Sequence, residues 1–89
     1  MKLAVIGSRE ITAGFALAGT ADVMACSDGE ESGTALREYA SREEIGIILI
    51  EKCRADEMTD EIERLMQIRD PYPLIVTIPT YNGDAEEKI

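Results

Sequence analysis

Three short runs of mainly aliphatic residues are continuous rather than alternating, and they limit the folds open to this chain more than any other feature. They cover residues 3–6 (Leu-Ala-Val-Ile), 45–50 (Ile-Gly-Ile-Ile-Leu-Ile) and 74–78 (Leu-Ile-Val-Thr-Ile). Continuous apolar strands are typical of parallel sheets that are covered on both faces. A weaker run at 23–26 has the lower hydrophobicity of an edge strand. The runs therefore predict a parallel sheet of four strands.

Stretches with helical spacing separate these runs. The first is expected to end at Gly19, a residue type that often follows helices. The second begins near Ser27 and Glu30, which stand in the S-x-x-E relation of a capping box. The third carries apolar residues at positions i, i+4, i+7 and i+8. These residues are Met58, Ile62, Leu65 and Met66.

One helix between each pair of successive strands requires crossover connections, which make the strands parallel and the units right-handed. We predict an α/β three-layer sandwich of the flavodoxin-like or receiver-like type, with strand order 2-1-3-4 and helices on both faces. Residues 3–6 and 45–50 form its centre, and 23–26 and 74–78 form its edges. A single domain is expected over 1–79, followed by a polar, flexible tail at 80–89.

The charge of the chain limits its partners. It has 18 Asp and Glu residues against 9 Lys and Arg, a net charge of −9. Nucleic acids are bound mainly by basic residues that neutralise phosphate, so we exclude them. Apolar runs stop far short of the roughly 20 residues that span a membrane, and the start lacks a secretory signal pattern. We expect a cytoplasmic protein without direct membrane insertion.

Few catalytic groups are present where this fold would use them, at the carboxyl ends of the strands. Cys26 and Cys53, with no His in the chain, cannot complete a zinc site or a Cys-His nucleophile. Their places after different strands make a disulfide between them unfavourable. Glu51 follows the third run with only Glu10 opposite it, so a hard-cation site lacks oxygens. We expect no catalytic residue, no metal and no cofactor.

Two alternatives remain open at this edge of the sheet. One is a receiver-like or phosphocarrier signalling domain that accepts a phosphoryl group. The other is a small-ligand module at the Gly7-Ser8-Arg9 turn, where a helix N-terminus can bind an anion. That turn lacks the further glycines of a dinucleotide fingerprint and the Gly-Lys-Ser/Thr of a P-loop.

Gly14 lies inside the first predicted helix, where glycine costs about 1 kcal/mol relative to alanine. The use of glycine there would be explained if another part of a protein packs closely against the helix at this position. The approaching group is either the sheet beneath the helix, which we favour, or another protein chain.

Four blocks along the chain resemble one family. The chain opens with Lys-Leu-Ala-Val-Ile-Gly at 2–7, and 14–19 (Gly-Phe-Ala-Leu-Ala-Gly) is similar to the motif G-F-x-L-A-G. Residues 43–50 (Glu-Glu-Ile-Gly-Ile-Ile-Leu-Ile) resemble E-D-I-G-I-I-L-I, and 72–79 (Tyr-Pro-Leu-Ile-Val-Thr-Ile-Pro) resemble Y-P-x-I-V-x-I-P. In this order and spacing they resemble the F subunits of archaeal-type and vacuolar-type (A/V-type) rotary ATPases.

The resemblance implies a non-catalytic component of the central stalk. Such a component binds the coiled-coil shaft, which is the D subunit of these ATPases, and through it the A3B3 head. It couples and regulates ATP hydrolysis or synthesis with rotation and with proton or sodium transport, peripheral to the membrane. Family members usually continue into a further helix after the I-P block, so we expect the tail at 80–89 to be a truncated form of that segment.

Contacts with the partner are expected at two places. One is the first loop and helix, and the other follows the last strand, because Ile11 and Tyr81 are apolar groups placed beside loops. The full predicted contact set is Ser8, Arg9, Ile11, Thr12, Tyr81 and Asn82.

Overall fold

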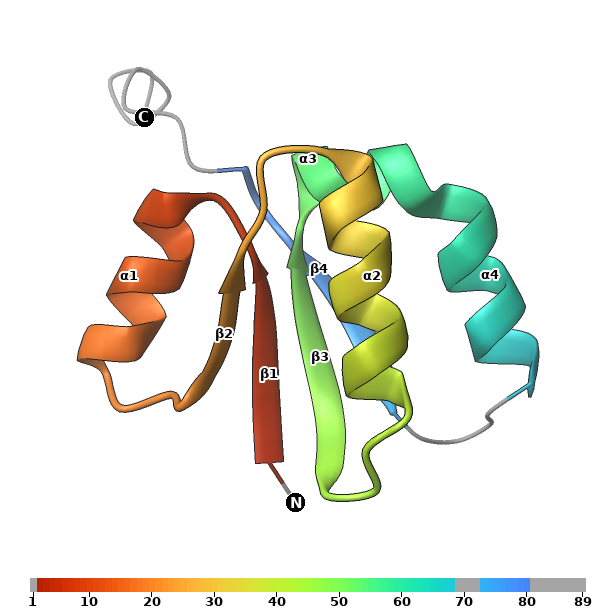
Figure 1. Cartoon of the computed structure of the whole chain (residues 1–89), viewed down its shortest axis with the longest axis horizontal. Coiled ribbons are helices and arrows are strands. Elements are labelled where there is room, and N and C mark those ends of the chain that lie inside the picture. The colour runs from red at the N-terminus through yellow and green to blue at the C-terminus, as the bar shows by residue number, and fades with distance from the viewer. Residues whose placement is uncertain (1, 69–72, 81–89) are drawn as a thin grey trace.

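The computed structural model describes residues 2–68 and 73–80 of the chain. Its strands are β1 (Lys2–Gly7), β2 (Asp22–Ala25), β3 (Ile45–Glu51) and β4 (Leu74–Ile78). Its helices are α1 (Arg9–Leu17), α2 (Gly29–Ala40), the short α3 (Lys52–Ala55) and α4 (Thr59–Ile68), with a 3-10 turn η1 (Asp56–Met58) between the last two (Figure 1). The predicted tail, apart from Thr80, lies outside the described residues.

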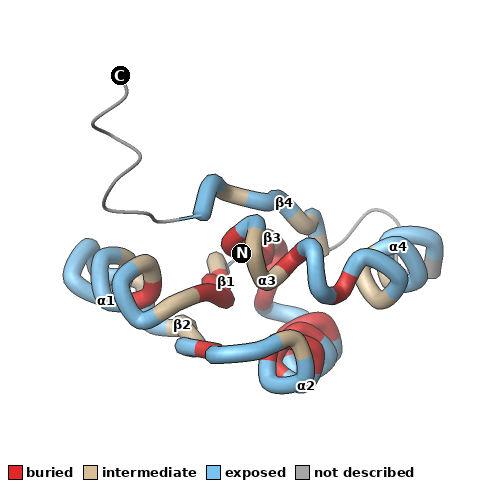
Figure 2. The backbone as a smooth tube through the Cα atoms, turned by 90° about the horizontal axis from the view of Figure 1, so that it is seen from above, coloured by how far each residue is buried: buried red, intermediate tan, exposed pale blue. Residues whose placement is uncertain are grey.

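All neighbouring strands are parallel, and their order is β2-β1-β3-β4, which confirms the predicted topology. Seen from above, α1 stands on one side of the sheet, while α2 and α4 stand on the other (Figure 2). The right-handed crossover rule explains this arrangement. The chain moves from β1 to β2 in one direction across the sheet, and from β2 onward to β3 and β4 in the opposite direction.

The main core lies between the sheet and α2. Ala4, Ile6, Ile48 and Ile50 point to this side, where they pack with Leu36 and other buried residues. The core is completed by half-buried side chains that pack against it: Met24, Ile62, Leu65 and Ile75.

Two helices differ in detail from the sequence prediction. The cap of α2 is Asp28 rather than Ser27, since the Asp28 side chain accepts a hydrogen bond from the Glu31 amide at 2.9 Å. The Glu31 carboxylate accepts hydrogen bonds from the Ser27 amide at 2.8 Å and the Ser27 hydroxyl at 2.9 Å, so Ser27 is a donor to Glu31 rather than the helix cap. The predicted third helix is divided into α3, η1 and α4.

The C-terminal end of α1 follows the sequence prediction, and the structure shows the residue that caps its start. Ser8 caps its start, and after Leu17 the chain turns at Gly19, whose φ of 105° lies in the left-handed region that favours glycine. In the third helical segment Met58 is buried as expected, but Met66 is 52% exposed and lies outside the core.

Candidate docking surface

The turn between β1 and α1 is held by a buried carboxylate. Glu51, at the end of β3, is 1% exposed and accepts a hydrogen bond from the Ser8 amide at 2.6 Å. A Cβ on Gly7 would lie 2.9 Å from the same Glu51 oxygen, so a larger residue does not fit there without a shift. Glu51 therefore joins β3 to the beginning of α1.

The four predicted contact residues on this turn have different surroundings. The Ser8 hydroxyl accepts a hydrogen bond from the Ile11 amide at 3.4 Å, and the buried Thr12 hydroxyl donates to the Ser8 carbonyl at 2.9 Å. Both hydroxyls are thus engaged in the first turn of α1. Arg9 is exposed, and Ser8 and Ile11 are both half-buried, so among these four residues Thr12 is the one that is shielded from solvent. Tyr81 and Asn82 lie outside the described residues.

The two cysteines line a hollow at the same edge of the sheet, together with Ser8, Arg9 and Arg54. Both are free thiols. Burial raises the pKa of Cys26, which disfavours the thiolate that nucleophilic chemistry requires. Within residues 2–68 and 73–80, no three His, Cys, Asp or Glu side chains are grouped to hold a metal ion. This edge gives the phosphotransfer alternative no support.

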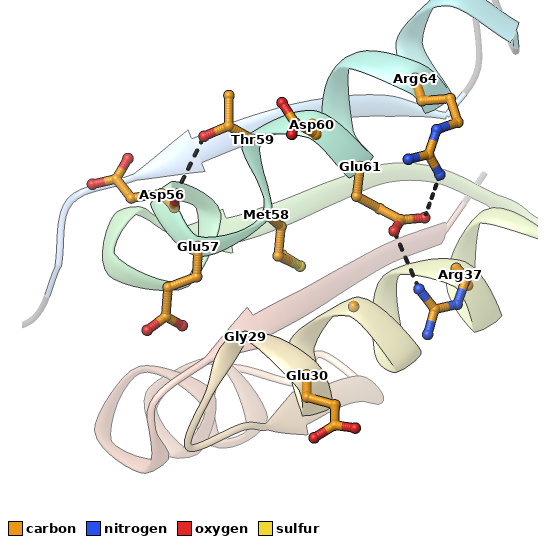
Figure 3. Close-up of a pocket in the computed structure, with 11 residues that line it drawn as sticks. Gly29, Glu30, Arg37, Asp56, Glu57, Met58, Thr59, Asp60, Glu61 and Arg64 are labelled. Atoms are coloured by element: carbon orange, nitrogen blue, oxygen red, sulfur yellow. Dashed lines mark hydrogen bonds and ion pairs between the residues drawn. The ribbon is translucent and has the colours of Figure 1, made fainter.

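A second hollow lies between α2 and the η1–α4 segment (Figure 3). Glu61 spans it, pairing with Arg37 of α2 at 3.2 Å and with Arg64 at 3.7 Å. Asp56 and Glu57 pair with Lys52 and Arg54 outside the hollow, at 3.1 and 3.4 Å. Arg37, Arg64, Lys52 and Asp56 are more than half exposed, whereas Glu61 and Arg54 are 21% and 16% exposed. We interpret the hollow as a partly solvated seam between two helices rather than as a reaction site.

The outer surface of α1 is unusual for such an acidic chain. Residues 11–20 carry no charged side chain, and Leu17 is 89% exposed. A Cβ built on Gly14 meets nothing within 4 Å. The close approach of the sheet that we favoured at Gly14 is therefore absent. The other explanation, contact with another protein chain, stays a prediction.

A further exposed apolar surface lies on the sheet itself. On the α1 side, Leu74 and Val76 of β4 are 49% and 38% exposed. They neighbour Ile47 and Leu49 of β3 in the parallel register, and Ile47 neighbours Leu3. We call this set of five residues the open face: Leu3, Ile47, Leu49, Leu74 and Val76. Although α1 packs on β1 and β2, no described segment covers β3 and β4 on this side (Figure 2).

Sequence reasoning missed the open face, although the necessary signal was present. The predicted strand order and right-handed crossovers already place a single helix on this side of a four-stranded sheet. Counting the helices on each face would have shown that two strands lack cover.

Comparisons with known proteins give consistent results. The model of the family described as ATP synthase (F/14-kDa) subunit matches residues 3–89. The F subunit of the A-type ATP synthase of Methanococcus aeolicus is 36% identical over 83 residues, covering 93% of this chain and 78% of that protein. The corresponding protein of Methanocaldococcus jannaschii is 35% identical over 86 residues, covering 97% and 82%.

A solved structure agrees with the fold. The crystal structure of the F subunit of the V-type ATP synthase from Archaeoglobus fulgidus superposes with a TM-score of 0.70 and 25% identity, covering 86% of this chain and 95% of that one. In the part of the chain that the structure describes, no helix is both long and apolar enough to cross a membrane.

Proposed function

The chain belongs to the ATP synthase (F/14-kDa) subunit family, and on that premise we propose that it binds the coiled-coil shaft, the D subunit, in the central stalk of an A/V-type rotary ATPase. In this role it has no catalytic activity of its own. It turns with the shaft and couples ATP hydrolysis or synthesis in the A3B3 head to rotation and ion transport. It works in the cytoplasm and reaches the membrane only through the rest of the complex.

The observation that carries this proposal is the uncharged, exposed apolar side of the molecule. Nearly a third of the residues are charged, yet residues 11–20 and the open face contain no charged side chain. Contiguous exposed apolar surface on a small domain marks a place where another protein binds. A protein that is fixed to a shaft needs such a surface.

A non-catalytic role is consistent with the polar groups at the strand ends. The carboxylate of Glu51 and the hydroxyls of Ser8 and Thr12 hold the β1–α1 turn together. In this proposal Arg9 and Ile11 contact the shaft directly, while Ser8 and Thr12 fix the turn that presents them. Tyr81 and Asn82 remain proposed contacts on the segment after β4.

Calorimetric titration of the full chain with the recombinant shaft protein from the same ATPase tests the proposal. We expect one chain to bind one shaft, and Arg9→Ala to weaken binding. Arg64→Ala is the matched control, because Arg64 is an exposed arginine on α4, on the opposite side of the sheet. If the unmodified chain does not bind the shaft, the proposed function is wrong; if Arg9→Ala binds as tightly as Arg64→Ala, only the contact assignment fails.

A further inference from the structure

Two strands of the sheet carry aliphatic side chains on both faces, and the described chain covers these side chains more completely on the α2 side than on the other. On the α2 side, Ile48 and Ile50 are fully buried, and Ile75 packs against the same core. On the other side, Leu74 and Val76 remain exposed. Strands that carry aliphatic side chains on both faces normally have cover on both faces. The pattern of β3 and β4 therefore points to a covering element that the described residues do not supply.

The parallel register arranges the open face in two rows. Leu3, Ile47 and Leu74 are neighbours across β1, β3 and β4. One step along the strands, Leu49 and Val76 continue the surface beside Val5, which is fully buried. The rows contain only aliphatic side chains. An occupant therefore needs an apolar surface rather than hydrogen-bonding groups.

The dimensions of the uncovered area match one helix. Neighbouring strands are about 4.8 Å apart, so two uncovered strands present a width close to the roughly 10 Å diameter of an α-helix. A strand of five residues, the length of β4, extends about 16 Å, which corresponds to about eleven helical residues or three turns. A helix placed there would lie beside α1, as α4 lies beside α2 on the other face (Figure 2).

We propose that the open face binds a single α-helix of the partner, through an apolar stripe about three turns long. This inference rests on the proposed function, in which the helix belongs to the coiled-coil shaft. The net charge of −9 favours a helix whose polar side is basic on balance, because charge complementarity speeds encounter and a strongly acidic helix would be repelled.

Charge also favours a partner helix over two other possible occupants of the open face, which are the chain's own residues 81–89 and a second copy of the chain. Residues 81–89, which follow β4, carry four charged side chains among nine residues and offer little apolar surface to match the open face. A second copy of the chain would bring another nine excess negative charges to the same interface. A basic amphipathic helix fits both the apolar face and the net negative charge of the chain.

Titration of open-face variants with the shaft protein tests the inference. Leu74→Ser and Val76→Thr remove exposed apolar atoms from β4, and each should weaken binding about tenfold, as central interface residues do. Met66→Ser is the matched control, because Met66 is exposed to a similar extent but lies on α4. Its affinity should stay within about twofold of the unmodified chain. Raising the salt concentration should slow association more than it changes dissociation.

Amide hydrogen exchange of the unmodified chain provides a readout that does not depend on variants. We expect β3 and β4 to gain protection when the shaft binds. Unchanged affinity of both β4 variants, or no added protection, overturns the inference while leaving the proposed function intact. Failure of the unmodified chain to bind the shaft overturns both. Two further outcomes also overturn the inference. Full protection of β4 in the free chain assigns the open face to another part of this chain. A dimer in sedimentation assigns it to a second copy.

Discussion

The two faces of the sheet are built from similar side chains but have different surroundings. On the face under α2 and α4, Ile48 and Ile50 are completely shielded from solvent. On the opposite face, Leu49 lies between them along β3 and is half-buried, and its neighbour Val76 is exposed. Hydrophobic side chains on the first face stabilise the fold, whereas those on the second are available for binding. Adjacent positions in one strand can therefore serve stability and assembly separately.

The largest expected effect compares these two faces within β3. Ile48→Ala should lower the free energy of unfolding by about 2–5 kcal/mol, because it leaves a cavity in a fully buried site. Leu49→Ala should lower it by only about 1 kcal/mol, because its side chain is half-buried. Urea denaturation of the full chain measures both. Equal losses would mean that the open face is already covered in the free chain.

The next effect concerns the join between β3 and α1. Gly7→Ala should destabilise the chain by about 1–3 kcal/mol, because the new methyl group would meet the Glu51 carboxylate at 2.9 Å. Glu51→Ala should lower stability by a similar amount, about 1–3 kcal/mol, because it leaves the Ser8 amide without this acceptor.

The double variant Gly7→Ala/Glu51→Ala tests whether the two positions are coupled. With the carboxylate removed, the added methyl group has more room, so the combined loss should be smaller than the sum of the single losses. Thermal and urea denaturation of the four proteins complete the cycle. Simple additivity would contradict direct contact between these residues.

A smaller effect of opposite sign is expected on the outer surface of α1. Gly14→Ala should stabilise the free chain by about 0.5–1 kcal/mol, since alanine favours the helix and the space around Gly14 is open. A loss of stability would instead indicate the close approach of the sheet that the sequence suggested. If the shaft contacts α1 at this point, the same variant binds the shaft more weakly although it is more stable.

The smallest effect separates the two thiols. Cys53 should react with iodoacetamide faster than Cys26, because Cys26 is more buried and burial raises its pKa. Mass spectrometry of the intact chain, with digestion to locate the label, measures the two rates. The raised pKa means that the buried neutral thiol supports folding at neutral pH. This contribution to stability is lost as the pH rises through the folded-state pKa of Cys26. In the labelling experiment, equal rates for the two cysteines would contradict the burial of Cys26.

The sequence was a good guide to the fold because its main signals are local or follow from chain geometry. Continuous apolar runs indicated the strands, and the single helix between each pair required parallel connections. The register of the α2 cap was harder to predict, because Ser27 and Asp28 are both suitable caps and only the structure shows which side chain reaches an amide. The break between α3 and α4 also has no clear signal in the apolar spacing.

The docking surface was only partly predictable. The predicted contacts at Ser8, Arg9, Ile11 and Thr12 remain predictions, and the structure adds that the hydroxyls of Ser8 and Thr12 are engaged within the first turn of α1. Leu74 and Val76 were missed because a continuous apolar run was interpreted as buried on both faces. Exposure depends on how many helices the topology assigns to each face, which is a property of the whole fold and not of the run.

The position of β4 at the end of the sheet has a consequence for the life of the protein before assembly. Leu74–Ile78 is an uncharged edge strand, with one side free for pairing in the described sheet. Unprotected edges of this kind readily recruit strands from other chains and promote aggregation. Copies in which this edge stays unpaired should therefore aggregate more readily at high concentration than copies in which another chain covers it.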